Sequence, residues 1–177
     1  DLIDDEIVEI FLEEAEEVLE TLQEFWPLYK ANHDDQESQS TVRRAFHTLK
    51  GSGRMVQAEV IGEFAWSIEN MLNRIIDQTI VLNTNGCDLI DYAITRIPEL
   101  IEDFRQRRAG SFNTSVLVAY ADSLTQGEQV AAFADVINSL NISDHETTGD
   151  TESELIDTES SVSESTVSVL DSSEELL

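Results

Sequence analysis

The stretch "RRAFHTLKGSG", from Arg43 to Gly53, places a histidine on a sequence with the periodicity of an amphipathic helix. Apolar residues recur here at spacings of three and four and predict a helix over about 41–55 (Val42, Ala45, Phe46, Leu49 and Val56). A second stripe carries the charges, at steps of four, three and four (Arg43, His47, Lys50 and Arg54). His47 is therefore expected on an outward, basic face of this helix.

Three more stretches with helical periodicity flank this one, over about 3–30, 58–78 and 87–107. The first has a mostly acidic face opposite a long apolar stripe, which consists of Ile3, Ile7, Ile10, Phe11, Ala15, Val18, Leu22, Phe25 and Leu28. No segment alternates with a period of two, so we expect no sheet. Four amphipathic helices with short connections predict an all-α fold, an antiparallel four-helix bundle.

Local signals predict where these helices begin and end. Ser40 or Thr41 is expected to cap the second helix, after a polar loop over 31–40. A turn around Asn85-Gly86 is expected before the fourth helix. Pro27 is expected to kink or stop the first helix, and Pro98 to bend or break the fourth.

The remainder of the chain differs from the bundle in composition. Two shorter helical patterns lie near 114–124 and 127–140, and the sequence after Asn141 is mostly Ser, Thr, Asp and Glu. Such a composition lacks the apolar density that offsets ordering entropy, at roughly 1–2 kcal/mol per residue. We therefore divide the chain into a bundle over 1–108, one or two accessory helices within 109–140 and a flexible acidic linker over 141–177.

The charge of the chain is strongly negative and unevenly distributed. Its 177 residues include 37 acidic and 10 basic ones, a net charge of −27, and every Lys and Arg lies at or before Arg108. Nucleic acids and anionic membrane surfaces both need a basic footprint, so neither is an expected partner. No apolar run approaches the roughly 20 residues of a membrane span, so no membrane insertion is expected.

The single cysteine, Cys87, allows no intramolecular disulfide, which fits a reducing compartment. The first residues, "DLIDDEIVEI", are acidic and unlike a signal peptide, and the chain begins without Met. We expect a cytoplasmic protein and a piece of a longer one.

The residues around His47 point to phosphoryl chemistry. An imidazole has an ordinary pKa of about 6.5, so its neutral form is available as a nucleophile near pH 7. Lys50 lies one turn away and can offset incoming negative charge. Gly51, at i+4, lies directly over His47, and Gly53 is expected to add room, although glycine in a helix costs about 1 kcal/mol relative to alanine. Glu69, a polar residue in an apolar run, can accept a proton from the other ring nitrogen.

These motifs resemble a known family. "HTLKGSGRMV" resembles the His-x-x-Lys-Gly signature of histidine phosphotransfer (HPt) domains, and "WSIENMLNR", with Glu69 twenty-two residues after His47, resembles the third helix of the HPt domain in CheA-type chemotaxis kinases. The opening "EIFLEEAEEVLETL" resembles the first helix of that group. The stretches "RRAFHTLKGSGRMV" and "EFAWSIENMLNR" are most similar to the multi-HPt kinases of type IV pilus systems, which control twitching motility. The resemblance covers about residues 1–108.

The resemblance implies a role for each matching position. His47 would be the phosphorylated residue, Lys50 would contact the phosphoryl group, Gly51 would provide clearance and Glu69 would orient the imidazole. Two positions depart from the family pattern. Gln57 replaces a frequent glycine, which predicts a changed local turn, and Trp66 replaces a frequent histidine, which predicts a changed surface toward the kinase domain.

The function expected from this reading is that of a phosphocarrier. A kinase ATP-binding domain would phosphorylate His47, most simply at Nε2, and a response-regulator receiver aspartate would then take the phosphoryl group. ATP and magnesium belong to the donor kinase, because this chain has no Gly-rich phosphate loop and is expected to bind no cofactor itself. The acidic linker would tether the carrier near its kinase.

Alternative interpretations of the same residues remain open. The bundle could be a scaffold that binds receivers without phosphorylation, or an enzyme with His47 as general base, although a second catalytic group is missing. Glu69 could be a structural acceptor for another helix. The partner-binding candidates Arg43 and Arg54 could be solvated.

Other polar and aromatic residues are read as structural. The cluster of His33, Asp34 and Asp35 is read as a solvated loop and not as a metal site. Trp26, Tyr29 and Trp66 are assigned to packing. Cys87 has no base placed to activate it.

Overall fold

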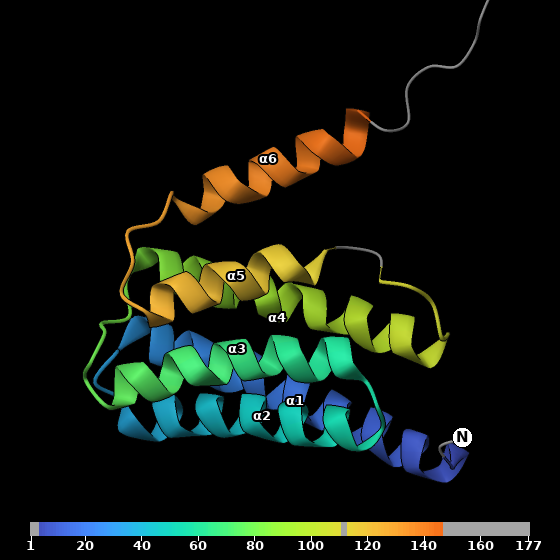
Figure 1. Cartoon of the computed structure of the whole chain (residues 1–177). Helices are drawn as coiled ribbons and strands as arrows, with labels where there is room; N and C mark the ends of the chain where they lie inside the picture. The colour runs from blue at the N-terminus through green and yellow to red at the C-terminus, as the bar shows by residue number, and fades with distance from the viewer. Residues whose placement is uncertain (1–3, 111–112, 147–177) are drawn as a thin grey trace, which may run out of the picture.

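The structure, a computed structural model, describes residues 4–110 and 113–146, and this part of the chain folds into helices with no strand (Figure 1). The four long helices are α1 (Asp5–Ala31), α2 (Gln36–Met55), α3 (Glu59–Ile76) and α4 (Thr84–Arg105). Two shorter ones follow, α5 (Thr114–Thr125) and α6 (Phe133–Glu146). The all-α prediction is confirmed. No helix in the described ranges is long and apolar enough to cross a membrane.

The long helices run antiparallel in succession and bury one common core (Figure 1). α2 packs between α1 and α3, and α4 closes against α1. The largest fully buried side chains come from all four helices and from α5: Leu22, Tyr29, Phe46, Leu49, Phe64, Ile68, Met71, Leu72, Leu89, Ile90, Ile97 and Leu117. Burial of this apolar surface, at roughly 25 cal/mol per Å², holds the amphipathic helices together.

The second helix begins earlier than predicted. α2 starts at Gln36, and its cap is Asp35, not Ser40 or Thr41. The Asp35 carboxylate accepts from the Ser38 backbone N–H at 3.0 Å and from the Ser38 hydroxyl at 2.6 Å. Asp is as good a cap as Ser, so the polar residues after it form the first turn of the helix and not a loop.

The fourth helix also begins earlier than predicted. Asn83 caps it, and its side chain accepts from the Gly86 backbone N–H at 2.9 Å. Asn85 and Gly86 therefore lie in the first helical turn and make no separate turn. Pro98 lies within α4 and Pro27 within α1, and both helices continue past them. The buried side chains on either side of Pro27, Trp26 and Tyr29, hold α1 in the core despite the lost backbone hydrogen bond.

The apolar stripe of α1 is only partly buried. Ile7, Ile10 and Leu28 are exposed, contrary to the prediction that they face the core. The hydroxyl of Ser52, near the end of α2, donates to Glu14, so the first turns of α1 extend past the end of α2 (Figure 1). Ile3 lies outside the described residues.

The two C-terminal helices have different relations to the bundle. α5 packs against α3 and places Leu117, Ala121 and Leu124 in the common core. α6 contacts α4, where the buried Phe133 ring lies edge-on to Tyr92 and Tyr120. α6 runs over 133–146 rather than the predicted 127–140, so the first residues assigned to the acidic linker are helical. The rest of that linker lies outside the described residues, and the proposed division into three segments stays a prediction.

Gly53 provides close packing between helices, which corrects its predicted role beside His47. A Cβ atom at Gly53 would lie 3.3 Å from the backbone nitrogen of Gly62 and 3.4 Å from the carbonyl oxygen of Ala58. Gly51, two residues earlier, has no such neighbour within 4 Å. Gly53 and Gly62 thus let α2 and α3 approach closely, and Gly51 alone leaves open space near His47.

This difference predicts opposite outcomes for one substitution at two positions. Gly53→Val forces backbone atoms of α3 apart and lowers the free energy of unfolding by about 1–3 kcal/mol, the usual range for overpacking. Gly51→Val changes it by less than about 0.5 kcal/mol, because valine and glycine differ little in helix propensity. Urea denaturation of both variants measures this, and equal stabilities would contradict the close-packing role of Gly53.

Candidate functional site

The candidate site lies where the middle of α2 faces the middle of α3. His47 is on α2, and its side chain is 56% exposed, whereas the Glu69 side chain on α3 is 3% exposed. His47 Nδ1 lies 2.7 Å from Glu69 Oε1, which joins the two helices by a hydrogen bond. The pair that the sequence predicted is therefore formed, with the carboxylate inside and the imidazole at the surface.

The protonation of Glu69 decides which nitrogen of His47 carries the proton. Burial raises the pKa of this carboxyl, but the hydrogen bonds and charges of Lys50 and His47 outweigh it and leave the pKa below its ordinary value of 4.5. Glu69 is thus ionised near neutral pH, and a carboxylate only accepts hydrogen bonds. Nδ1–H of His47 must then be the donor, which leaves the lone pair of the neutral ring on Nε2.

Two further cations surround the buried carboxylate. Lys50 Nζ lies 2.7 Å from Glu69 Oε2, and Arg43 Nη1 lies 3.7 Å from Oε1. Lys50 Nζ is also 3.3 Å from His47 Nδ1, but both atoms carry protons when Nδ1 donates to Glu69, so no hydrogen bond joins them. In this structure Lys50 forms an ion pair with Glu69, on the Nδ1 side of the His47 ring.

Trp66, which the sequence assigned to packing and, from the family pattern, to the surface toward a kinase domain, is a direct neighbour of the site. Lys50 Nζ lies 4.7 Å from the centroid of its ring, and the guanidinium of Arg54 lies 6.0 Å from it. Trp66 lies three residues, or about one helical turn, before Glu69. This spacing from the predicted acceptor was the sequence signal that could have placed Trp66 at the site. Arg54 reaches this ring and not the His47–Glu69 pair.

The turn after α2 contains the position where the family pattern often has glycine. Gln57 adopts φ 59, in the left-handed region that glycine adopts without strain. The turn thus has the backbone geometry that a glycine would favour, with a strained non-glycine residue. It lies beyond the last turn of α2, away from the contacts of His47.

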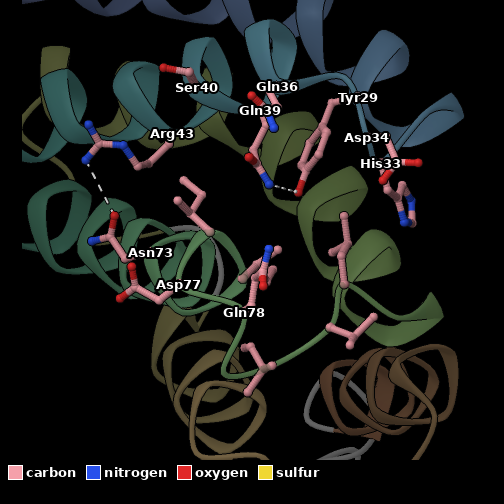
Figure 2. A pocket seen from close by; sticks show the side chains of 15 residues that line it. Tyr29, His33, Asp34, Gln36, Gln39, Ser40, Arg43, Asn73, Asp77 and Gln78 are labelled. Carbon is pink, nitrogen blue, oxygen red and sulfur yellow. Dashed lines mark hydrogen bonds between the residues drawn. The ribbon is translucent and has the colours of Figure 1, made fainter.

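A groove of about 1170 Å³ opens beside the site, between α2, the end of α3 and the segment that leads to α4 (Figure 2). Arg43 and Asn73 line it, and Arg43 Nη1 is 3.5 Å from Asn73 Oδ1. Arg43 lies one turn before His47, and Asn73 one turn after Glu69. His47 and Glu69 do not line the groove, so it adjoins the His47 site without containing it.

The loop histidine His33 lies apart from this site. Its ring centroid is 5.9 Å from that of Tyr29, and its Nε2 is 3.9 Å from Cys87 Sγ. Burial raises the pKa of the Cys87 thiol, so the thiol is less reactive than an exposed one. Within the described residues, no three metal-ligating side chains come together.

The exposed imidazole, held by a buried carboxylate on the face of a helical bundle, is an arrangement that fits a side chain on which a group is transferred. Comparison with known families agrees, because residues 6–107 match the Hpt domain family. The chain belongs to the Hpt family. It is a histidine phosphotransfer domain, the class of phosphocarrier that the sequence predicted.

Individual relatives are CheA proteins. The chain is 26% identical over 101 residues to the chemotaxis protein CheA of Borreliella burgdorferi, which covers 57% of this chain and 12% of that protein. It is 21% identical over 123 residues to the chemotaxis protein CheA of Listeria monocytogenes serovar 1/2a, and this match covers 70% of this chain and 20% of that protein. The chain thus spans a fifth or less of these curated relatives.

A solved structure shares the fold. The phosphorylated P1 domain of CheA3 in complex with CheY6 from R. sphaeroides superposes with a TM-score of 0.62 at 18% identity, covering 71% of this chain and all of that one. These matches support the CheA-type resemblance. The narrower assignment to pilus-type kinases stays a prediction from the sequence.

The buried carboxylate makes stability depend on pH in one direction. Because the pKa of Glu69 is lowered on folding, its contribution is fully present above the ordinary value of 4.5 and is lost as the pH falls below it. Glu69→Gln is expected to lower the free energy of unfolding at pH 7 by about 1–3 kcal/mol, since charged hydrogen bonds are lost. The difference in free energy of unfolding between Glu69→Gln and the native protein becomes smaller in acid.

Denaturation curves at several pH values measure this dependence. Glu63→Gln is the matched control, because Glu63 is exposed on the same helix and the substitution removes the same charge. A deficit that is independent of pH, or equal in both variants, would show that the ion pairs of Glu69 do not stabilise the fold.

Proposed function

We propose that His47 is the phosphoacceptor of this domain, which takes a phosphoryl group from the ATP-binding domain of a CheA-type histidine kinase and passes it to the aspartate of a response-regulator receiver. The observation that carries the proposal is the 2.7 Å contact between His47 Nδ1 and the ionised Glu69. It leaves the exposed imidazole with its lone pair on Nε2. An exposed histidine without such a partner would have no fixed tautomer.

The transfer step follows from this geometry. Nε2 attacks the γ-phosphorus of ATP, the bond from that phosphorus to the β,γ-bridging oxygen breaks, and ADP leaves with the electron pair. The ring becomes a phosphorylated imidazolium, whose Nδ1–H stays hydrogen-bonded to Glu69, so the carboxylate offsets the new positive charge. In the second step a receiver carboxylate oxygen attacks the phosphorus, the P–N bond breaks and Nε2 regains its electron pair.

The charges around the site favour a phosphoryl group within a chain of net charge −27. Lys50 lies near the imidazole and can turn from Glu69 toward the phosphoryl oxygens. Arg43 and Arg54, one turn before and two turns after His47, would meet the partner domain. The groove beside Arg43 extends this surface and gives a receiver or kinase domain room to contact α2 and α3.

The partners are proposed by analogy with the relatives. A CheA3 P1 domain of this fold is described in complex with CheY6, which supports a receiver as the acceptor. ATP and magnesium would be bound by the donor kinase and not by this chain. We expect this exchange to take place in the cytoplasm, where kinase and receiver would meet.

Phosphorylation can be tested with radiolabelled ATP and a catalytic amount of a CheA-type ATP-binding domain. The native chain is expected to acquire label that is lost in acid and kept in base, as a P–N bond requires. His47→Gln removes the label. His33→Gln is the control for a second exposed histidine: His33 lines the groove but makes no contact with the His47–Glu69 pair, so the variant is expected to keep the label.

A second arm replaces the kinase with phosphoramidate, a small phosphoryl donor that needs no docking surface. Label from phosphoramidate but not from the kinase would mean that His47 is a competent acceptor with a different donor. No label from either source would contradict the proposal and favour a scaffold that binds its partners without phosphorylation.

Clearance above His47 gives a further prediction. Gly51→Val places two methyl groups one turn after His47, where the native surface is open. The rate of phosphorylation by the kinase domain is expected to fall about tenfold or more, because the approach of the reacting groups is displaced. Gly51→Ser, with a smaller side chain, should lose less, and equal rates for all three proteins would show that clearance is not limiting.

A further inference from the structure

The first turns of α1 carry two large apolar side chains that the rest of the described structure leaves exposed (Figure 1). Ile7 is 44% exposed and Ile10 is 57% exposed. Both share one stripe of the helix with Glu14, at positions i, i+3 and i+7. α2 contacts this stripe at Glu14, whose carboxylate accepts from the Ser52 hydroxyl at 2.7 Å, and α2 ends at Met55. The stripe therefore continues past the end of α2 without a helix on it.

Met55 adds a third exposed apolar side chain at the same place. Because α1 and α2 are antiparallel, Ile10, four residues before Glu14, and Met55, three residues after Ser52, lie on the same side of the Glu14–Ser52 contact. Met55 is 79% exposed. We call the three residues Ile7, Ile10 and Met55 the α1 shelf. Single exposed apolar residues are normal on a protein surface, whereas a cluster of them marks an interaction site.

Acidic side chains border the shelf and have no cation to pair with. Glu6 and Glu13 lie four residues before and three residues after Ile10, so both are its neighbours on the helix surface. Both are exposed, and neither forms an ion pair within the part of the chain that the structure describes. The shelf is thus apolar surface beside negative charge that the bundle does not neutralise.

Neighbouring cations of the bundle are engaged elsewhere. Arg105, near the end of α4, pairs with Glu16 on another side of α1, at 3.0 Å. Arg54 precedes Met55 in the sequence, but its guanidinium lies 6.0 Å from the ring centroid of Trp66 on α3. The positive charge that would complement the shelf must therefore come from a partner.

We propose that the α1 shelf is a docking site for a basic amphipathic helix of another protein. The apolar stripe of such a helix would pack on the shelf in line with α2, and its lysines or arginines would pair with Glu6 and Glu13. The shelf begins two helical turns beyond His47. The inference therefore does not rest on the proposed role of that residue.

Charge and shape together select this occupant. The chain has a net charge of −27, so a second copy, its own acidic segment after Asn141 or an anionic membrane would bring like charges together. A helix fits because the shelf continues a seam on which a helix, α2, already packs. The seam from Ile7 to Glu14 is only about 10 Å long, at 1.5 Å per residue, so we expect a weak and transient contact.

The probe for this site is a synthetic amphipathic helix of leucine and lysine, about five turns long, added to the full chain. A peptide with glutamate in place of lysine tests the role of charge, and a scrambled peptide of the same composition tests the amphipathic arrangement. Fluorescence anisotropy of the labelled peptide measures Kd, and amide chemical shifts of the chain locate the bound peptide. We expect the lysine helix to bind best and to shift amides of the first turns of α1 and the end of α2.

Matched substitutions separate the apolar contact from general attraction. Ile10→Ser is expected to raise Kd about five- to tenfold, because an apolar contact is lost. Leu28→Ser should bind like the native chain, since Leu28 is 51% exposed on the same helix but lies at its other end. Circular dichroism verifies that both variants are folded.

A second pair of substitutions tests the charge beside the shelf. Glu13→Gln is expected to raise Kd about threefold and to weaken its dependence on salt, because one ion pair with the peptide is lost. Glu20→Gln is the control, because Glu20 is exposed on the same face of α1 two turns farther from the shelf. It should leave Kd unchanged.

The other outcomes overturn the inference. Equal effects within either pair of variants would show that overall charge, and not the shelf, holds the peptide. Equal binding of the glutamate peptide would show that basic charge is not recognised, and no binding of the lysine peptide would remove a basic helix as the occupant. A dimer of the native chain in sedimentation, lost in Ile10→Ser, would make the shelf a contact between copies.

Discussion

The ionised carboxylate of Glu69, almost fully buried between α2 and α3, is the constraint on which the site depends. A charge removed from water is stabilised only when opposite charges and hydrogen bonds take the place of solvent. Here His47, Lys50 and, at a longer distance, Arg43 provide them, and all three come from one stripe of α2. The same contacts that make the burial tolerable also orient the imidazole, so stability and chemistry share one set of interactions.

This arrangement requires α2 and α3 to lie at a particular separation and register. Gly53 and Gly62 let the two backbones approach, and the buried rings of Phe46 and Phe64 fill the interior behind the site. The bundle therefore acts as a rigid support on which a small number of polar side chains are held from behind. The exposed side of His47 remains open, as the proposed transfer of a phosphoryl group between two proteins requires.

Much of this was visible in the sequence because helices repeat with a fixed period. The spacing of His47, Lys50 and Gly51 places them on one face whatever the rest of the fold does, and Glu69 stands out as an acid in an apolar run. The first residues of α2 and α4 were predicted too late in the sequence, because Asp35 and Asn83 cap these helices ahead of residues that resemble loops. Caps depend on one side-chain hydrogen bond, which periodicity does not report.

Periodicity in the sequence was sufficient for the helical class and the basic stripe, and the family resemblance added the pairing of His47 with Glu69. Only the packed structure showed that Gly53 serves helix contact while Gly51 leaves open space, that Ile7 and Ile10 extend past the core, and that Trp66 covers Lys50. The physical reason is the same in each case. A residue's own helix sets the direction of its side chain, but the neighbouring helix decides whether that side chain meets backbone, charge or water.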